Sequence, residues 1–71
     1  MEDFIIKVII NGEICNLEKI IILSDLLQSQ GYDVKRVAVE INKIIIPKNQ
    51  YISTIINDGD KIEIVQFVGG G

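Results

Sequence analysis

The sequence predicts a two-layer α+β domain, and three features lead to that prediction. Period-two patterns occupy the first 17 residues, one stretch near residue 25 has helical spacing, and period-two patterns return after residue 37. Alternating strands present one face to a core, and one helix can cover one face of a small sheet. We therefore expect a mixed sheet of four to five strands packed on one main helix.

The first element is a β-hairpin. Its first strand alternates in the run that contains Phe4, Ile6, Val8 and Ile10. Asn11-Gly12 supplies a two-residue turn that tolerates positive φ, and residues 13–17 continue in extended form. Cys15 lies in that second strand, and we interpret it as core filler because the chain has no histidine to activate a nucleophile.

The predicted helix spans residues 22–30. Residues 20–22 favour a strand, but the following stretch carries leucines at i, i+3 and i+4: Leu23, Leu26 and Leu27. Gly31 stands where a left-handed residue is expected to end a helix. Ser24 is available as a cap, although it lies two residues later than the ideal position.

Two further strands follow the helix. Residues 37–42 alternate, and residues 44–46 form a short strand that Pro47 closes, because proline cannot donate to a ladder and so marks an edge or an exit. Residues 48–56 are expected to form a loop or a single helical turn. Three of their side chains are expected to turn inward: Tyr51, Ile52 and Ile55.

The last strand begins after a turn at residues 57–60. The period of two places Ile62 and Ile64 toward the core. The opposite face then carries Glu63, Val65 and Phe67.

Composition excludes several kinds of site. The net charge of −3 and the pI of 4.7 disfavour a nucleic acid partner. With one cysteine and no histidine, the chain cannot form an internal disulfide or a zinc or iron–sulfur site from thiolates and imidazoles. The acidic start and the interrupted apolar stretch fit neither a signal peptide nor a membrane span. We expect a soluble, cytoplasmic protein that is a monomer when free.

No catalytic constellation is evident in the sequence. Asp58 and Asp60 flank Gly59 and could be a metal or general-base pair, but turn formation is the favoured explanation. Three basic residues are interpreted as a solvated face: Lys35, Arg36 and Lys43. The clustered glycines at residues 69–71 precede no helix and form no phosphate-binding loop.

The three terminal glycines are the candidate functional segment. Glycine has no side chain, so Gly69, Gly70 and Gly71 could enter a passage where any Cβ would clash. At roughly 3.3–3.6 Å per residue, they would carry the carboxylate about 10 Å beyond the last side chain. The alternative is a frayed end. We expect residues 1–68 to form one domain and residues 69–71 a flexible tail.

Several stretches together resemble the ThiS family, the small ubiquitin-like sulfur carriers of thiamine biosynthesis. They run in the family's order and are INGE (10–13), DLL (25–27), VAVEIN (37–42), IP (46–47), DGDKIEIV (58–65) and FVGGG (67–71). The chain departs from the family at Ile22, near which members often carry a Ser or Thr helix cap, and Gly69 extends the minimal Gly-Gly ending. The resemblance implies a β-grasp fold.

The resemblance also implies a carrier that is a substrate of other enzymes and is not itself an enzyme. A ThiF-like adenylyltransferase would adenylate the Gly71 carboxylate with ATP and Mg²⁺, and a sulfur donor system would convert the adenylate to a thiocarboxylate. Thiazole synthase, ThiG, would then take the sulfur. The chain itself would bind no cofactor. The tail would enter the partner's site, while Glu63, Val65, Phe67 and Val68 would bind the partner's surface.

Other interpretations remain open at this point. A MoaD-like carrier for molybdopterin synthesis would share the fold and the activation chemistry, and ubiquitin-like conjugation would join Gly71 to a lysine. A β-grasp interaction module with no covalent chemistry would not need the tail at all. An RNA-binding module is disfavoured by the acidic balance.

Overall fold

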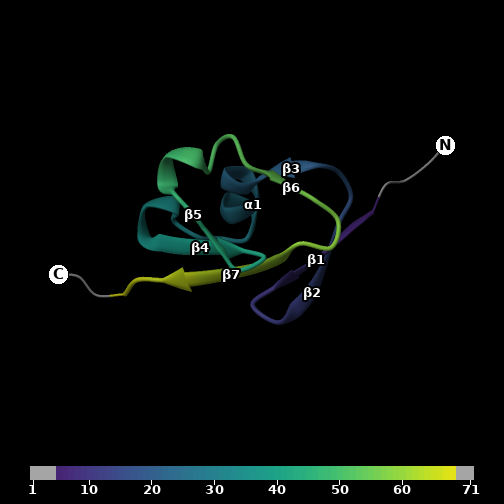
Figure 1. Ribbon diagram of the computed structural model, residues 1–71, viewed down its shortest axis with the longest axis horizontal. Helices are drawn as coiled ribbons and strands as arrows, with labels where there is room; N and C mark the ends of the chain where they lie inside the picture. The colour runs from purple at the N-terminus through teal and green to yellow at the C-terminus, as the bar shows by residue number, and fades with distance from the viewer. Residues whose placement is uncertain (1–4, 69–71) are drawn as a thin grey trace.

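The main sheet is built around the last strand of the chain. The computed structural model describes residues 5–68, and β7 (Lys61–Gln66) lies at the centre of a sheet of order β2-β1-β7-β4-β5 (Figure 1). The other four strands are β1 (Ile6–Ile10), β2 (Glu13–Leu17), β4 (Val37–Ile41) and β5 (Ile44–Ile46). Because β7 is parallel to β1 and antiparallel to β4, the predicted mixed sheet is confirmed, with five strands.

Two hairpins flank β7 and use the same kind of turn. Asn11 and Gly12 join β1 to β2 with φ of 50° and 86°, as predicted from the Asn-Gly pair. Asn42 and Lys43 join β4 to β5 with φ of 53° and 70°. Positive φ at both central residues gives a turn whose twist matches that of the flanking strands. Lys43 adopts this conformation without glycine's freedom, which is uncommon for a residue with a long side chain.

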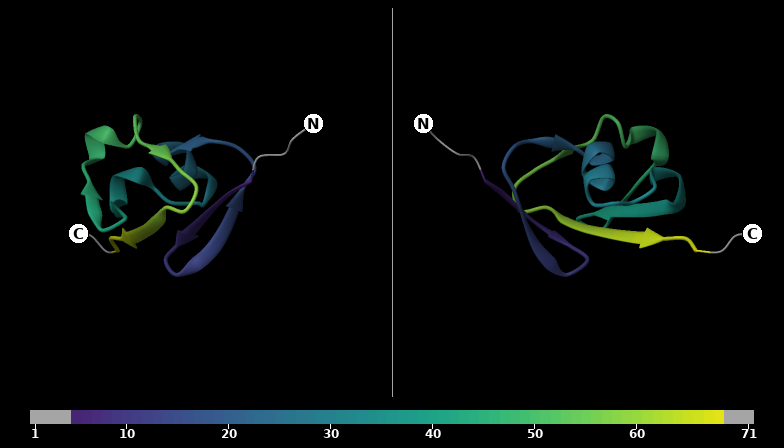
Figure 2. Two further views of the ribbon diagram at one scale, coloured as in Figure 1. Left: turned by 45° about the vertical axis from the view of Figure 1, so that its right-hand side comes forward. Right: turned by 180° about the vertical axis from the view of Figure 1, so that it is seen from behind.

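Helix α1 (Leu23–Ser29) packs on one face of the sheet (Figure 2). The predicted span of 22–30 is confirmed to within one residue at each end. Gly31 follows the helix with φ of 85°, in the left-handed conformation expected of it. The remaining helical segments are two 3-10 turns, η1 (Val34–Arg36) and η2 (Lys48–Gln50).

Helix α1 starts without a side-chain cap. The Leu23 N–H donates to the Thr54 carbonyl at 2.8 Å, and the Ser24 N–H donates to the Tyr51 carbonyl at 3.1 Å. Two carbonyls from the loop before the last turn therefore satisfy two of the N–H groups that a helix start leaves free. The suggestion that Ser24 caps the helix is wrong, because Ser24 lies inside the first turn.

The core lies between α1 and the inner face of the sheet. It is aliphatic except for one tyrosine, and consists of Ile6, Val8, Ile10, Leu23, Leu26, Leu27, Val37, Val39, Ile41, Tyr51, Ile56, Ile62 and Ile64. Cys15 packs against this cluster and is partly buried, as expected of core filler. At about 25 cal/mol per Å², burial of these side chains is the main favourable contribution to folding.

A second, two-stranded sheet was not predicted. β3 (Ile21–Ile22) pairs antiparallel with β6 (Ile55–Ile56) beside the start of α1. The isoleucines before the helix favour a strand, and two of them, Ile21 and Ile22, form one before the helix begins at Leu23.

The loop before β7 is only partly as predicted. It contains the single helical turn expected of it, η2, and Tyr51 is buried. Ile52 and Ile55, however, are exposed, so the prediction that they turn inward is wrong. Pairing in β6 sends adjacent side chains to opposite faces, and it is Ile56 that enters the core.

Candidate functional site

The outer face of β7 carries the side chains predicted for partner binding. Ile62 and Ile64 are buried against the core, whereas Glu63 and Val65 are exposed on the other face, as the period of two predicts. Exposure is 59% for Val65, and among the apolar residues beyond the strand it is 55% for Phe67 and 91% for Val68. The Phe67 side chain is therefore not buried against the edge of the sheet.

Asn11 holds β7 where its pairing with β1 ends. The Asn11 N–H donates to the Ile62 carbonyl at 2.9 Å. Its side-chain Oδ1 accepts from the Ile64 N–H at 2.7 Å, and its Nδ2 donates to the Ile64 carbonyl at 3.2 Å. The Asn11 side chain thus bonds β7 as one more strand residue would. Both the N–H and the carbonyl of Ile64 therefore have a hydrogen-bond partner.

Asn42 and Asp60 hold the start of β7 from the other side. The Asn42 side chain accepts from the Lys61 N–H at 3.0 Å and donates to Asp60 Oδ1 at 2.9 Å. Asp60 is buried, and its Oδ2 accepts from the Asn57 N–H at 2.8 Å. Asp58 accepts from the Lys7 N–H at 2.8 Å. Both aspartates therefore serve the turn and its attachment to the sheet, as predicted for this pair.

The other end of β7 is held by the segment around η1. The Phe67 N–H donates to the Arg36 carbonyl at 2.7 Å, and Val37 pairs with Gln66. Beneath this end, the buried Tyr51 hydroxyl donates to the Val37 carbonyl at 3.4 Å. Burial raises the pKa of this hydroxyl from its ordinary value of 10.0, and this effect outweighs the lowering effect of the Val39 backbone.

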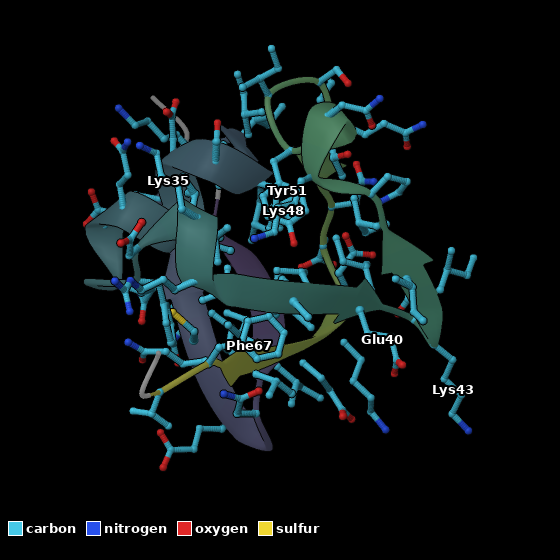
Figure 3. All side chains as sticks on the ribbon, turned by 90° about the vertical axis from the view of Figure 1, so that its left-hand side faces the viewer. Lys35, Glu40, Lys43, Lys48, Tyr51 and Phe67 are labelled. Carbon is cyan, nitrogen blue, oxygen red and sulfur yellow. The ribbon has the colours of Figure 1, made fainter. Side chains whose placement is uncertain are left out.

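The basic residues do not form one group. Arg36 lies 3.7 Å from Asp33 in an exposed ion pair, and the Lys48 ammonium donates to the Lys35 carbonyl at 2.7 Å. Lys43 lies in the β4–β5 turn (Figure 3). This dispersed arrangement agrees with the prediction of a solvated face.

Strand pairing adds three residues that the sequence alone did not single out. On the outer face, Ala38 lies opposite Val65, and Glu40 lies between Glu63 on β7 and Ile45 on β5. These side chains line a shallow groove of about 170 Å³. Alternation in residues 37–41 places Ala38 and Glu40 on one face, and the pairing of Glu40 with Ile45 across the turn adds Ile45 to it. Only the strand order brings that face beside Val65.

The predicted tail residues Gly69, Gly70 and Gly71 lie outside the described residues. The structure nevertheless places the residues immediately before them, with Phe67 and Val68 following β7 at the C-terminal end of the sheet (Figure 1).

The sequence pattern that defines the ThiS family matches residues 8–71. The chain belongs to the ThiS family. The match begins within β1 and includes all later elements, α1 and β7 among them, and the glycines. ThiS membership and the β-grasp architecture confirm what the sequence resemblance implied.

Relatives of this ThiS-family chain include a sulfur carrier protein ThiS and a thiazole synthase. The former, from Bacillus subtilis, is 51% identical over 49 residues, which cover 69% of this chain and 74% of the relative. The latter, from Paramagnetospirillum magneticum, is 48% identical over 65 residues, which cover 92% of this chain but 20% of the relative. The chain thus spans about a fifth of that thiazole synthase.

Among solved structures, the crystal structure of the thiamine biosynthesis protein ThiS from Geobacter metallireducens superposes with a TM-score of 0.79. The two sequences are 25% identical, and the superposition covers 93% of this chain and 100% of the other. Within residues 5–68, no helix is long and apolar enough to cross a membrane.

Proposed function

We propose that this protein is a sulfur carrier of thiamine biosynthesis whose Gly71 carboxylate is adenylated and then converted to a thiocarboxylate. The main support is the ThiS family match, which continues through residue 71 and so includes the glycines that would carry the sulfur. The sulfur carrier from Bacillus subtilis adds support, because about half of the aligned residues are identical. The carrier is a substrate in this scheme and performs no catalysis itself.

The chemistry requires activation because a carboxylate is a poor electrophile. A carboxylate oxygen of Gly71 would attack the α-phosphorus of ATP, and Mg²⁺-bound pyrophosphate would leave. The resulting acyl adenylate has AMP as its leaving group. A persulfide donor would displace AMP, and a thiol would then cleave the acyl disulfide, which leaves the thiocarboxylate on the carrier. A ThiF-like adenylyltransferase would supply the activating site, and glycine would give that site unhindered access.

Thiazole synthase is the proposed acceptor of the sulfur. The thiazole synthase of Paramagnetospirillum magneticum contains, within one chain, a segment similar to this protein. A covalent link raises the effective concentration of one module near the other, which is useful when the two meet in every catalytic cycle.

Partner binding would use the outer face of the last strand. Val65, Phe67 and Val68 are apolar and exposed, and Glu63 lies beside them. A few aromatic and aliphatic side chains commonly carry most of the binding free energy of an interface. Because these residues directly precede the glycines, binding them would aim the tail at the partner's active site. We further propose that the carrier acts in the cytoplasm, where ATP is available, and is a monomer between encounters.

The test is the intact mass of the protein after incubation with a ThiF-like enzyme, MgATP and a sulfur donor. The expected result is the mass increase for exchange of one oxygen for sulfur, located at Gly71 by fragmentation. Protein without residues 69–71, and protein with one residue added after Gly71, are the controls and should show no increase. Absence of both the thiocarboxylate and the adenylate from the intact protein would instead favour an interaction module.

A further inference from the structure

The shallow groove on the outer face combines two carboxylates with apolar walls. Glu40 and Glu63 are direct neighbours on β4 and β7, while Ala38, Ile45 and Val65 surround them. In Figure 3, Glu40 and Phe67 lie on the side of β4 opposite to Tyr51 and so face away from the core. Ile45 is 73% exposed, although its side chain is entirely apolar.

The two carboxylates oppose each other without a cation between them. Like charges at directly paired positions destabilise an antiparallel sheet. Two cationic residues lie near, Lys61 on the same face of β7 and Lys43 in the β4–β5 turn. Neither forms an ion pair, because within residues 5–68 the one ion pair shorter than 4.0 Å joins Arg36 to Asp33. We therefore expect this pair to cost the free protein some stability, and natural proteins accept such costs mainly at functional sites.

An arginine side chain would supply the positive charge that the two carboxylates of this groove lack. Its planar guanidinium can donate to two carboxylates at once, and it is more weakly hydrated than an ammonium group. Its aliphatic stem can lie along apolar side chains such as Val65 and Ile45. We propose that the groove binds an arginine from the surface of the adenylating enzyme; this inference rests on the proposed function.

The position of the groove determines which kinetic step it can affect. Glu63 precedes Gly69 by six residues, which in extended chain corresponds to roughly 20 Å. The bound arginine is therefore remote from the carboxylate that reacts. It contributes to docking and to the rate of association, and the chemical step after docking does not depend on it.

The test compares Glu40→Gln, Glu63→Gln and the double variant with the wild-type protein. The Kd for the adenylating enzyme is measured by titration at about 0.05 M and about 0.5 M salt, since screening is strong at the higher concentration. We expect the double variant to bind at least tenfold more weakly at low salt, with a smaller dependence on salt and an unchanged adenylation rate at saturating carrier. Glu18→Gln, which is exposed and away from this groove, is the matched control and should bind as wild type does.

Thermal unfolding of the free proteins gives a second measurement, in which the expected change is a gain in stability, whereas binding is expected to weaken. Removal of one charge from the facing pair should raise the melting temperature of the same variants that bind weakly. An unchanged Kd in the double variant overturns the inference, and so does a lowered melting temperature, because weak binding would then reflect damaged folding.

The two proposals fail in different ways. If wild-type protein acquires the thiocarboxylate but the double variant binds normally, only the arginine site is wrong. If wild-type protein neither binds the enzyme nor reacts, both proposals are overturned.

Discussion

The two ends of β7 are held in different ways. Over its first four residues, side chains hold the strand from both sides: Asn42, itself bound to Asp60, accepts from the Lys61 N–H, and Asn11 bonds the N–H and the carbonyl of Ile64. At its end, one backbone hydrogen bond from Phe67 to Arg36 follows the last ladder pair, and the apolar side chains are exposed. The residues that stabilise β7 are therefore separate from the residues proposed to bind the partner, so either set can be altered without the other.

The largest expected effect comes from the fixed end. Asn11→Ala removes both side-chain hydrogen bonds to Ile64 and leaves alanine at a φ of 50°. We expect the free energy of unfolding to fall by about 2–4 kcal/mol, because unsatisfied backbone groups and the left-handed conformation each add to the loss. Urea unfolding measures this change.

Two variants separate the causes at this position. Asn11→Gly retains the backbone freedom but loses the hydrogen bonds, so it should lie between wild type and Asn11→Ala. Asn16→Ala, on exposed β2, should change the free energy of unfolding by less than about 0.5 kcal/mol. A loss no larger in Asn11→Ala than in Asn16→Ala would show that the side-chain bonds do not fix this end.

The next effect concerns the exposed end. Phe67→Ala should raise the carrier concentration needed for half-maximal adenylation by about tenfold, because truncation of an anchoring aromatic typically removes more than 1 kcal/mol of binding free energy. Its free energy of unfolding should stay nearly unchanged, since the side chain is 55% exposed. ATP–pyrophosphate exchange measured over a range of carrier concentrations gives the first quantity. Ile52→Ala, an exposed residue of the loop before β6, is the control; equal curves for the two variants would contradict the anchoring role.

A smaller effect sharpens the comparison at the start of β7. Lys43→Gly should stabilise the protein by about 0.5–1 kcal/mol. Glycine removes the strain of a side chain at a φ of 70°, and this gain exceeds the loss that comes from the greater chain entropy of the unfolded state. For a domain of this size that corresponds to a rise in melting temperature of roughly 2–8 °C. Calorimetry measures it, and a lower melting temperature would mean that the lysine side chain contributes contacts that offset the strain.

The smallest effect tests the support beneath the tail end. Tyr51→Phe removes a hydrogen bond of 3.4 Å and should lower the free energy of unfolding by about 0.5 kcal/mol at neutral pH. Because burial raises the pKa of Tyr51 in the folded state above 10.0, the unfolded chain loses this proton first as the pH rises. The folded state then binds more protons, so wild-type stability falls above pH 10. Below that pH the contribution is constant.

The measurement is the difference between wild-type and Tyr51→Phe stability as a function of pH. We expect this difference to narrow above pH 10, since the variant has no such proton to lose. A difference that widens above pH 10 would contradict the sign of the pKa shift.

Local patterns predicted the strands and the helix because each depends on neighbours in the chain. The alternation in β7 also predicted which of its side chains are outside. The hydrogen bonds from Asn11 to Ile64 span 53 residues, and they depend on the register of β7 against β1, which no local pattern contains. The pairing of Glu40 with Glu63 likewise requires knowing that β4 lies beside β7. The two-residue strands β3 and β6 are too short for a period to be recognised.

The central position of β7 also determines how the domain responds to force. If a partner holds the tail and pulls, the load passes along β7 to two neighbours, β1 on one side and β4 on the other. The hydrogen bonds on each side lie across the direction of pull, so they share the load and cannot open one after another. The carrier can therefore be drawn toward an active site by its end without losing the strand that presents that end.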